Sequence, residues 1–168
     1  SSAASDVYKR QMVLVRRGIE VEAFSGPVFE SLKEPINRGA VSVDDAKAWT
    51  TTSSRVAVVR AKFDTMLVTA ASVHCSKHKT TAELLVALKD ILERTVPADH
   101  YVIGCDTNVP GGESSAFQGR MTASGFTIGH TGDQVTVAKQ RTMLQTQTLK
   151  SGEVDVSCKD YVLSLIHI

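Results

Sequence analysis

The sequence has little excess charge, few aromatic residues and no long apolar run. Lys+Arg 19 against Asp+Glu 18 leave a net charge of +1 over 168 residues. Such a balance gives no general electrostatic attraction to nucleic acid or anionic membrane, so a polyanion would have to be bound by a local site. Aromatic residues make up only 5% of the chain and offer no platform for base stacking. No apolar run approaches the roughly 20 residues of a membrane span, so none is predicted.

Cysteine is also scarce. The three cysteines, Cys75, Cys105 and Cys158, are too few and too scattered to form a disulfide framework. They form no CxxC pair of the kind that indicates zinc. This usage favours a reducing, intracellular compartment, and the oligomeric state is left open.

What is present describes a globular domain. Hydrophobic residues make up 42% and charged residues 22%, which is typical of a soluble protein with one core. Neither end carries a helix cap or a turn signal. We therefore expect residues 1–11 to be a foreign or disordered leader, residues 12–165 to form the domain, and residues 166–168 to be a truncated tail.

The first half of the chain predicts mainly strands. Apolar or β-branched runs predict strands at Met12–Val15, Val56–Val59 and Thr65–Val73, the last two as a hairpin. The pattern between them is weak. Prolines, glycine and a Thr/Ser run predict loops at Gly26-Pro27, at Pro35-Ile36-Asn37 and at Thr50–Ser54, with one helical turn at Val43–Trp49.

The second half carries a clear amphipathic helix. Thr80 and Glu83 have the spacing of a capping box, and Pro97 lies just beyond the expected end. Five apolar residues share one face of this helix, namely Leu84, Leu85, Leu88, Ile91 and Leu92.

A short buried strand, Tyr101–Cys105, follows this helix. A second helix is predicted at Ser114–Ala123 with Gly125 as the residue after its cap. Further strands are predicted at Val135–Ala138, Thr142–Leu149 and Tyr161–Leu165. Strands alternating with helices predict a layered α/β or α+β domain.

Two polar residues follow the buried strand and can meet one small target. Asp106 and Asn108 are separated by one residue, so they share a face if the segment is extended. A carboxylate can orient or deprotonate a water, and a carboxamide can donate to a phosphoryl oxygen. The alternative is that both residues only shape a turn.

His74 ends the apolar strand of the hairpin. A histidine at this place can give or accept a proton near neutral pH, or it can be a surface residue bonded within a turn. Cys75 beside it does not form a nucleophile pair with His74, because adjacent strand residues point to opposite faces.

The order of these parts resembles the endonuclease/exonuclease/phosphatase family, the deoxyribonuclease-I-like metal-dependent phosphoesterases. The resemblance covers the chain from about Met12 to Leu163, where the matching segments are Val68–His74, Ile103–Asn108, Ser124–Phe126 and Lys159–Leu163. At the second segment the family usually has Gly-Asp-aromatic-Asn, whereas this chain has Cys105 for the glycine and Thr107 for the aromatic residue.

The resemblance implies a fold and a set of roles. The fold would be α+β, a partial four-layer αββα sandwich with mixed, mostly antiparallel sheets. His74 would be the proton donor or transition-state partner at the phosphate, and Asp106 would orient the attacking water. Asn108 would hold a phosphoryl oxygen, and Asp160 would help position groups near the site.

Two basic residues are candidates for binding the substrate. Lys139 and Arg141 share a face if their segment is extended, and they could bind a substrate phosphate. The alternative is a solvated strand face. The partner would be a phosphate ester, with nucleic acid among the candidates.

The resemblance further implies Mg²⁺ as cofactor, but part of its ligand set is missing. No convincing counterpart of the family's usual Glu ligand is found, since Glu20 and Glu22 fit a surface run, and His167 lacks the preceding Asp of the family's closing pair. We therefore expect a fragment of reduced or no activity, from a parent Mg²⁺-dependent hydrolase of ester bonds. The alternatives are a degenerate, non-catalytic member of the fold that acts as a binding module, and an unrelated α/β protein.

Overall fold

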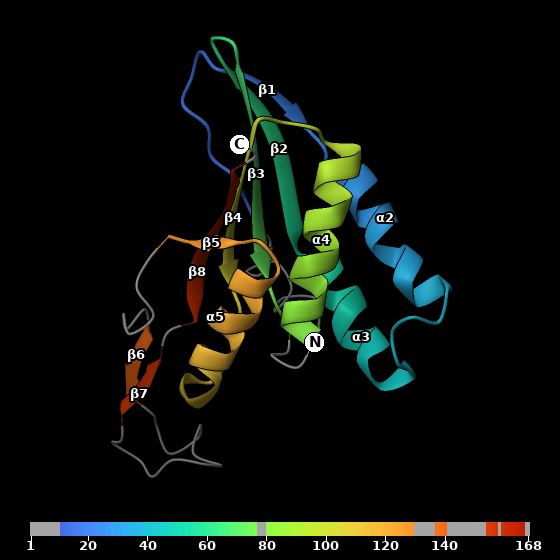
Figure 1. The fold of residues 1–168 in the computed structure, drawn as a ribbon, viewed down its shortest axis with the longest axis vertical. Coiled ribbons are helices and arrows are strands. Elements are labelled where there is room, and N and C mark those ends of the chain that lie inside the picture. Colours follow the sequence, from blue (N-terminus) through green and yellow to red (C-terminus); the bar gives the residue numbers. More distant parts are fainter. Residues whose placement is uncertain (1–10, 77–79, 130–136, 141–153, 158, 167–168) are drawn as a thin grey trace, which may run out of the picture.

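The computed structural model describes residues 11–76, 80–129, 137–140, 154–157 and 159–166 (Figure 1). A mixed six-stranded sheet has the order β1-β2-β3-β4-β8-β5. Its strands are β1 (Glu20–Ala23), β2 (Val56–Phe63), β3 (Met66–His74), β4 (His100–Asp106), β5 (Thr127–Ile128) and β8 (Asp160–Ile166). Strands β3 and β4 pair in parallel, whereas the other neighbours in this sheet are antiparallel.

Four α-helices accompany the sheet in the described part of the chain. They are α2 (Ser25–Asn37), α3 (Val43–Ser53), α4 (Thr81–Thr95) and α5 (Ser114–Ala123), the last preceded by the short 3₁₀ turn η3 (Gly111–Glu113). A separate two-stranded sheet pairs β6 (Val137–Gln140) with β7 (Val154–Ser157). The α+β fold predicted from the sequence is confirmed, with one main sheet and one layer of helices in the described residues (Figure 1).

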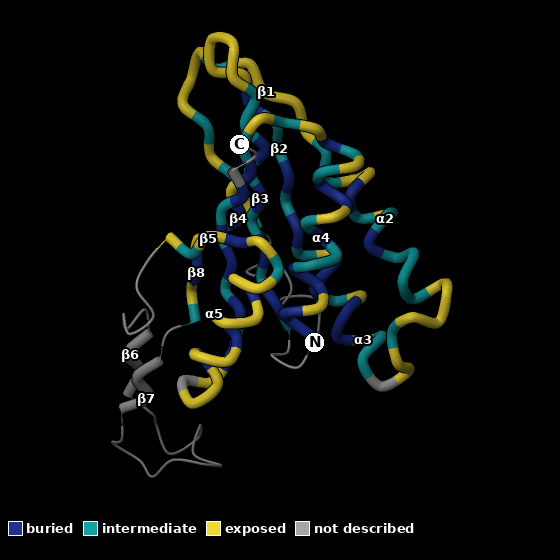
Figure 2. Tube along the Cα trace, in the orientation of Figure 1, coloured by how far each residue is buried: buried dark blue, intermediate teal, exposed yellow. Residues whose placement is uncertain are grey.

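The core lies between the helices and one face of the sheet. Alternate residues of β4, Tyr101, Ile103 and Cys105, are buried against the helices, together with Leu84 and Leu88 of α4. Figure 2 shows the buried residues gathered in the middle of the molecule, with exposed residues at the β2–β3 hairpin tip. The opposite face of the sheet, called the outer face here, contains Val102 and Val162, which remain 36% and 48% exposed.

Several predicted elements are confirmed. The β2–β3 hairpin is present, and the helix predicted at Ser114–Ala123 has those bounds as α5. Gly125 follows its cap with φ +87°, the left-handed conformation that glycine adopts without steric cost. Helix α4 buries all five predicted apolar residues. The predicted capping box is wrong, because Thr80 makes no side-chain capping bond and Glu83 forms an ion pair with Arg120 at 2.7 Å.

The strand predicted at Met12–Val15 is wrong. This segment is irregular, and Met12 and Leu14 are 68% and 84% exposed. The edge of β2 is instead occupied by β1, where Glu22 pairs with Arg60. An apolar run without a partner strand has no ladder to join, so its hydrophobicity alone does not make it a strand.

The three predicted loops are wrong, because the first two lie inside helix α2 and the third forms the end of helix α3. Pro27 lies in the first turn of α2, where its missing N–H would have no intrahelical partner, and Pro35 lies in the last turn, where one intrahelical bond is lost. The Thr/Ser run closes α3 because three hydroxyls donate to the carbonyl four residues earlier; they belong to Thr50, Thr51 and Ser53. Trp49 Nε1 donates to the Leu32 carbonyl at 2.8 Å and fastens α3 to α2.

In the last third of the chain, the strand predicted at Tyr161–Leu165 is confirmed as β8. The predicted strand Val135–Ala138 overlaps β6, and the one predicted at Thr142–Leu149 lies outside the described residues. No described helix combines the length and the hydropathy that a membrane crossing requires.

The buried face of α4 leads to a stability prediction. Leu88 is 0% exposed, so Leu88→Ala is expected to lower the unfolding free energy by about 3 kcal/mol through lost apolar contact and a residual cavity. Urea denaturation followed by circular dichroism measures this. Asp90→Ala, at an exposed position of the same helix, is the control and should change stability by less than about 0.5 kcal/mol. Equal effects of the two substitutions would contradict the packing described for α4.

Candidate functional site

Strand register brings three predicted site residues into one row. His74 is paired with Asp106 across β3 and β4, and Asp106 is paired with Asp160 across β4 and β8. Paired residues on neighbouring strands project from the same face. Their chain neighbours Val73, Cys105 and Tyr161 are buried in the core, so the row His74–Asp106–Asp160, called the site row here, lies on the outer face.

The site row is accessible at its histidine and central carboxylate. His74 Nδ1 lies 3.8 Å from Asp106 Oδ2, and the two side chains are 26% and 34% exposed. That separation is within ion-pair range if the imidazole is protonated, and it is too long for a hydrogen bond. The two groups therefore face one small volume at the end of the sheet without being locked to each other.

Asn108 connects the ends of β3 and β4. Its backbone N–H donates to Asp106 Oδ1 at 3.1 Å, and its side-chain Nδ2 donates to the Cys75 carbonyl at 2.5 Å. Its φ of +53° lies in the left-handed region, which Asn tolerates better than most residues. The turn predicted as the alternative for Asp106 and Asn108 is thus present, and the same turn holds the Asp106 carboxylate in place.

Two buried thiols lie beside the site row and face away from it. Cys75 and Cys105 are both free and buried. Burial raises the pKa of Cys75 to about 12, although a hydrogen bond with Thr81 acts to lower it. Burial also raises the pKa of Cys105 well above its usual value. Both thiols are protonated at neutral pH and are poor nucleophiles, in agreement with the prediction that Cys75 and His74 form no catalytic pair.

The remaining predicted residues are not part of this row. Lys139 belongs to β6 opposite Asp155, but its side chain is not among those described, and Arg141 lies outside the described residues. Glu20 and Glu22 lie exposed on β1 at the sheet edge, separated from β4 by two strands. Among the described residues, no group of three His, Cys, Asp or Glu side chains could hold a metal ion.

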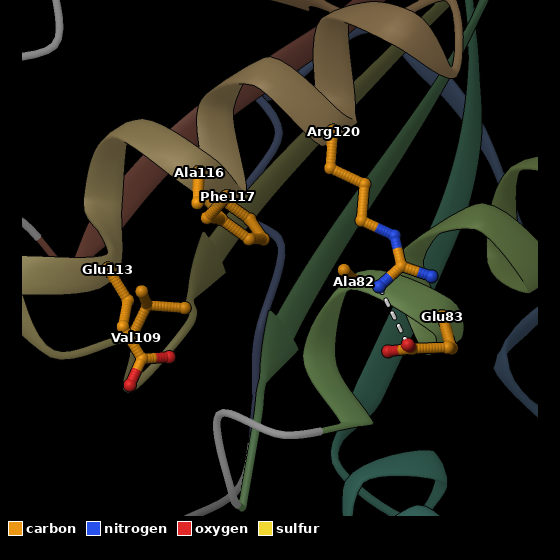
Figure 3. Close-up of a pocket in the computed structure, with 7 residues that line it drawn as sticks. All are labelled: Ala82, Glu83, Val109, Glu113, Ala116, Phe117 and Arg120. Atoms are coloured by element: carbon orange, nitrogen blue, oxygen red, sulfur yellow. Dashed lines mark ion pairs between the residues drawn. The ribbon is translucent and has the colours of Figure 1, made fainter.

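A cavity of about 340 Å³ opens between α4 and α5. Figure 3 shows Phe117 and Val109 on one side of it and the Glu83–Arg120 ion pair on the other. Val109 follows Asn108 directly and is buried in the helix-covered core. The cavity is therefore next to the site row in the chain but lies on the other face of the sheet.

Sequence reasoning missed the groups that support the site row. The backbone carbonyls of Cys75 and Lys159 accept bonds from Asn108 and Thr107, and a carbonyl leaves no trace in a residue pattern. Thr107 did carry a signal, because it replaces the aromatic residue expected from the resemblance.

Comparison with known proteins gives a likeness in fold. No protein-family model matches the sequence, and no curated protein matches it either. Among solved structures, the endonuclease domain of TRAS1, a telomere-specific non-LTR retrotransposon, superposes with a TM-score of 0.54 at 13% identity over 90% of this chain and 58% of that one. An endonuclease/exonuclease/phosphatase family protein from Leptotrichia buccalis C-1013-b gives a TM-score of 0.46 at 13% identity, over 66% of this chain and 42% of that one. The chain thus spans less than two thirds of either neighbour, and it shares with the first of them the fold of an endonuclease domain.

Proposed function

We propose that the site row, together with Asn108, belongs to a metal-dependent phosphoesterase, which hydrolyses phosphodiester or phosphomonoester bonds by attack of an activated water. The observation that carries the proposal is the 3.8 Å approach of His74 Nδ1 to Asp106 Oδ2. These two residues and Asp160 come from three strands that are distant in sequence. The likeness in fold to an endonuclease domain supports the same class of reaction and makes nucleic acid the first substrate to test.

Asp106 is the residue that orients and deprotonates the attacking water. Its Oδ1 accepts the Asn108 N–H, which fixes the carboxylate and leaves Oδ2 on the side of His74. A positioned carboxylate of this kind acts as a general base.

Asn108 and His74 act on the phosphate. The Asn108 carboxamide has two N–H donors, of which one binds the Cys75 carbonyl. The other donates to a phosphoryl oxygen, where negative charge increases during the reaction. The His74 imidazolium donates a proton to the leaving oxygen.

The site row offers carboxylate oxygens, the type of ligand that Mg²⁺ prefers. Mg²⁺ takes one or two carboxylates and completes its shell with water and phosphate oxygens. Asp160 would hold it, because Asp160 is the register partner of Asp106 across β4 and β8, and in this proposal Asp106 acts on the water. When bound, the ion supplies stabilisation of the charge on the leaving oxygen.

The test is hydrolysis of a generic phosphodiester with and without Mg²⁺. His74→Gln is expected to lower kcat by about 100-fold, because the proton donor to the leaving group is lost. His100→Gln is the matched control, since His100 lies on the same face at the other end of β4, about 20 Å away along the strand. Equal activity of the two variants would contradict the role of His74.

A second candidate is a non-catalytic binding module of the same fold. It is favoured by the lack of a three-ligand metal cluster among the described residues. In the same assay, binding of the phosphodiester without turnover in wild-type protein at saturating Mg²⁺ would select this candidate over the enzyme.

A further inference from the structure

Thr107 lies between Asp106 and Asn108 and points into the protein. It is 0% exposed, and all its polar groups are bonded. Its N–H and its Oγ1 both donate to the Lys159 carbonyl at 2.8 Å. Its Oγ1 also accepts the Val109 N–H at 3.3 Å, and its carbonyl accepts the Thr81 hydroxyl at 3.0 Å.

These bonds hold both peptide groups that flank Asn108. The preceding peptide is held through its carbonyl by Thr81, and the following peptide is held through the Val109 N–H by the Thr107 hydroxyl. The orientation of two successive peptide planes determines φ and ψ of the residue between them. The left-handed conformation of Asn108, which aims its carboxamide, therefore depends on Thr107.

The same side chain acts on the start of β8. The Lys159 carbonyl belongs to the peptide that leads into Asp160, and Thr107 donates two bonds to that carbonyl. The first residue of β8 is thereby held opposite Asp106. An aromatic side chain at position 107 has no oxygen next to its Cβ for these bonds, so the arrangement is a property of this sequence.

We propose that Thr107 is a positioning residue: its buried hydroxyl sets the Asn108 carboxamide and Asp160 in register with Asp106. The proposal rests on the proposed function. Thr107 does not touch the substrate, because it lies on the core side of the turn, and it acts only through the backbone of its neighbours.

The test compares Thr107→Val with Thr107→Ser. Thr107→Val removes the hydroxyl at nearly constant volume and is expected to lower kcat about 10- to 100-fold, since small displacements of catalytic groups have effects of this size. KM should change little. Thr107→Ser keeps the hydroxyl and should restore most of kcat, which a loss of packing alone would not explain.

Thr69→Val is the matched control. Thr69 is also 0% exposed, and its hydroxyl donates to the Val96 carbonyl at 3.2 Å, on β3 away from the site row. The Thr69→Val substitution should leave kcat unchanged. If Thr107→Val does not fold, Thr81→Val removes the bond to the Thr107 carbonyl and is expected to lower kcat in the same direction.

A second readout does not depend on activity. In ¹⁵N-resolved NMR spectra, the Asn108 carboxamide protons and the Val109 amide should keep their wild-type shifts in Thr107→Ser and Thr69→Val, and both should change in Thr107→Val. In the substitute Thr81→Val, which keeps the Thr107 hydroxyl, the change is expected at the Asn108 carboxamide. An unaltered Asn108 signal in Thr107→Val, or an unaltered kcat, would overturn the positioning role. A wild-type protein without hydrolysis would overturn the proposed function instead, while the NMR comparison would still decide whether Thr107 holds Asn108.

Discussion

Asp106→Asn is expected to lower kcat for phosphodiester hydrolysis by about 10³-fold, because a carboxamide cannot accept the proton of the attacking water. The substitution is nearly isosteric, and the amide oxygen can still accept the Asn108 N–H that Asp106 Oδ1 accepts now. The fold should therefore be kept. Steady-state kinetics at saturating substrate and Mg²⁺ measure the effect.

The control is Asp99→Asn. Asp99 Oδ2 also accepts a backbone N–H, that of Leu67, at 2.7 Å, and it precedes β4 at the end of the strand remote from Asp106. Its substitution should leave kcat unchanged. Hydrolysis by Asp106→Asn within about tenfold of wild type, less than the smallest usual contribution of a general base, would contradict its role.

The unfolding free energy is expected to fall by roughly 4 kcal/mol as the pH rises through the titration of Cys75, the value that corresponds to a pKa raised from 9.0 to about 12. Below pH 9 the thiol is protonated in both states and has no effect. Above pH 9 the unfolded chain loses the proton while burial retains it in the folded protein, so the unfolded state is favoured until the pH passes about 12.

Urea denaturation at several pH values, in wild-type protein and in Cys75→Ala, isolates this contribution. Other groups that titrate at alkaline pH are common to both proteins and cancel in the difference. The variant starts from a lower stability because of the lost sulfur, and its stability should fall less steeply with pH. Parallel pH profiles would contradict a buried, protonated Cys75.

The elements predicted correctly are those whose pattern of burial appears directly in the sequence. The apolar residues of α4 recur at helical spacing because one face of that helix packs on the sheet. Helix α2 was missed because it buries only Val28 and Leu32 among its residues and contains Pro35. It depends on packing against distant parts of the chain, such as the Trp49 bond to the Leu32 carbonyl, and such contacts are not encoded in a local window.

The sequence predicted which residues belong to the candidate site better than it predicted how they lie relative to one another. His74 and Asp106 could be selected because each ends an apolar strand. Their common row follows from the register of β3 with β4, which depends on how α4 returns the chain to the sheet. Thr107 stands out in the sequence because it replaces an expected aromatic residue, but its role could not be assigned, because its partners are mainly backbone groups of Lys159 and Val109.

The positive φ of Asn108 restricts which residues evolution can place there. Glycine would accept the backbone shape but would remove the carboxamide. Aspartate tolerates the left-handed backbone moderately well. Its carboxylate, however, would replace the Nδ2 donor by an oxygen that faces the Cys75 carbonyl. A β-branched residue would satisfy neither requirement, so few mutational routes lead away from asparagine at this position.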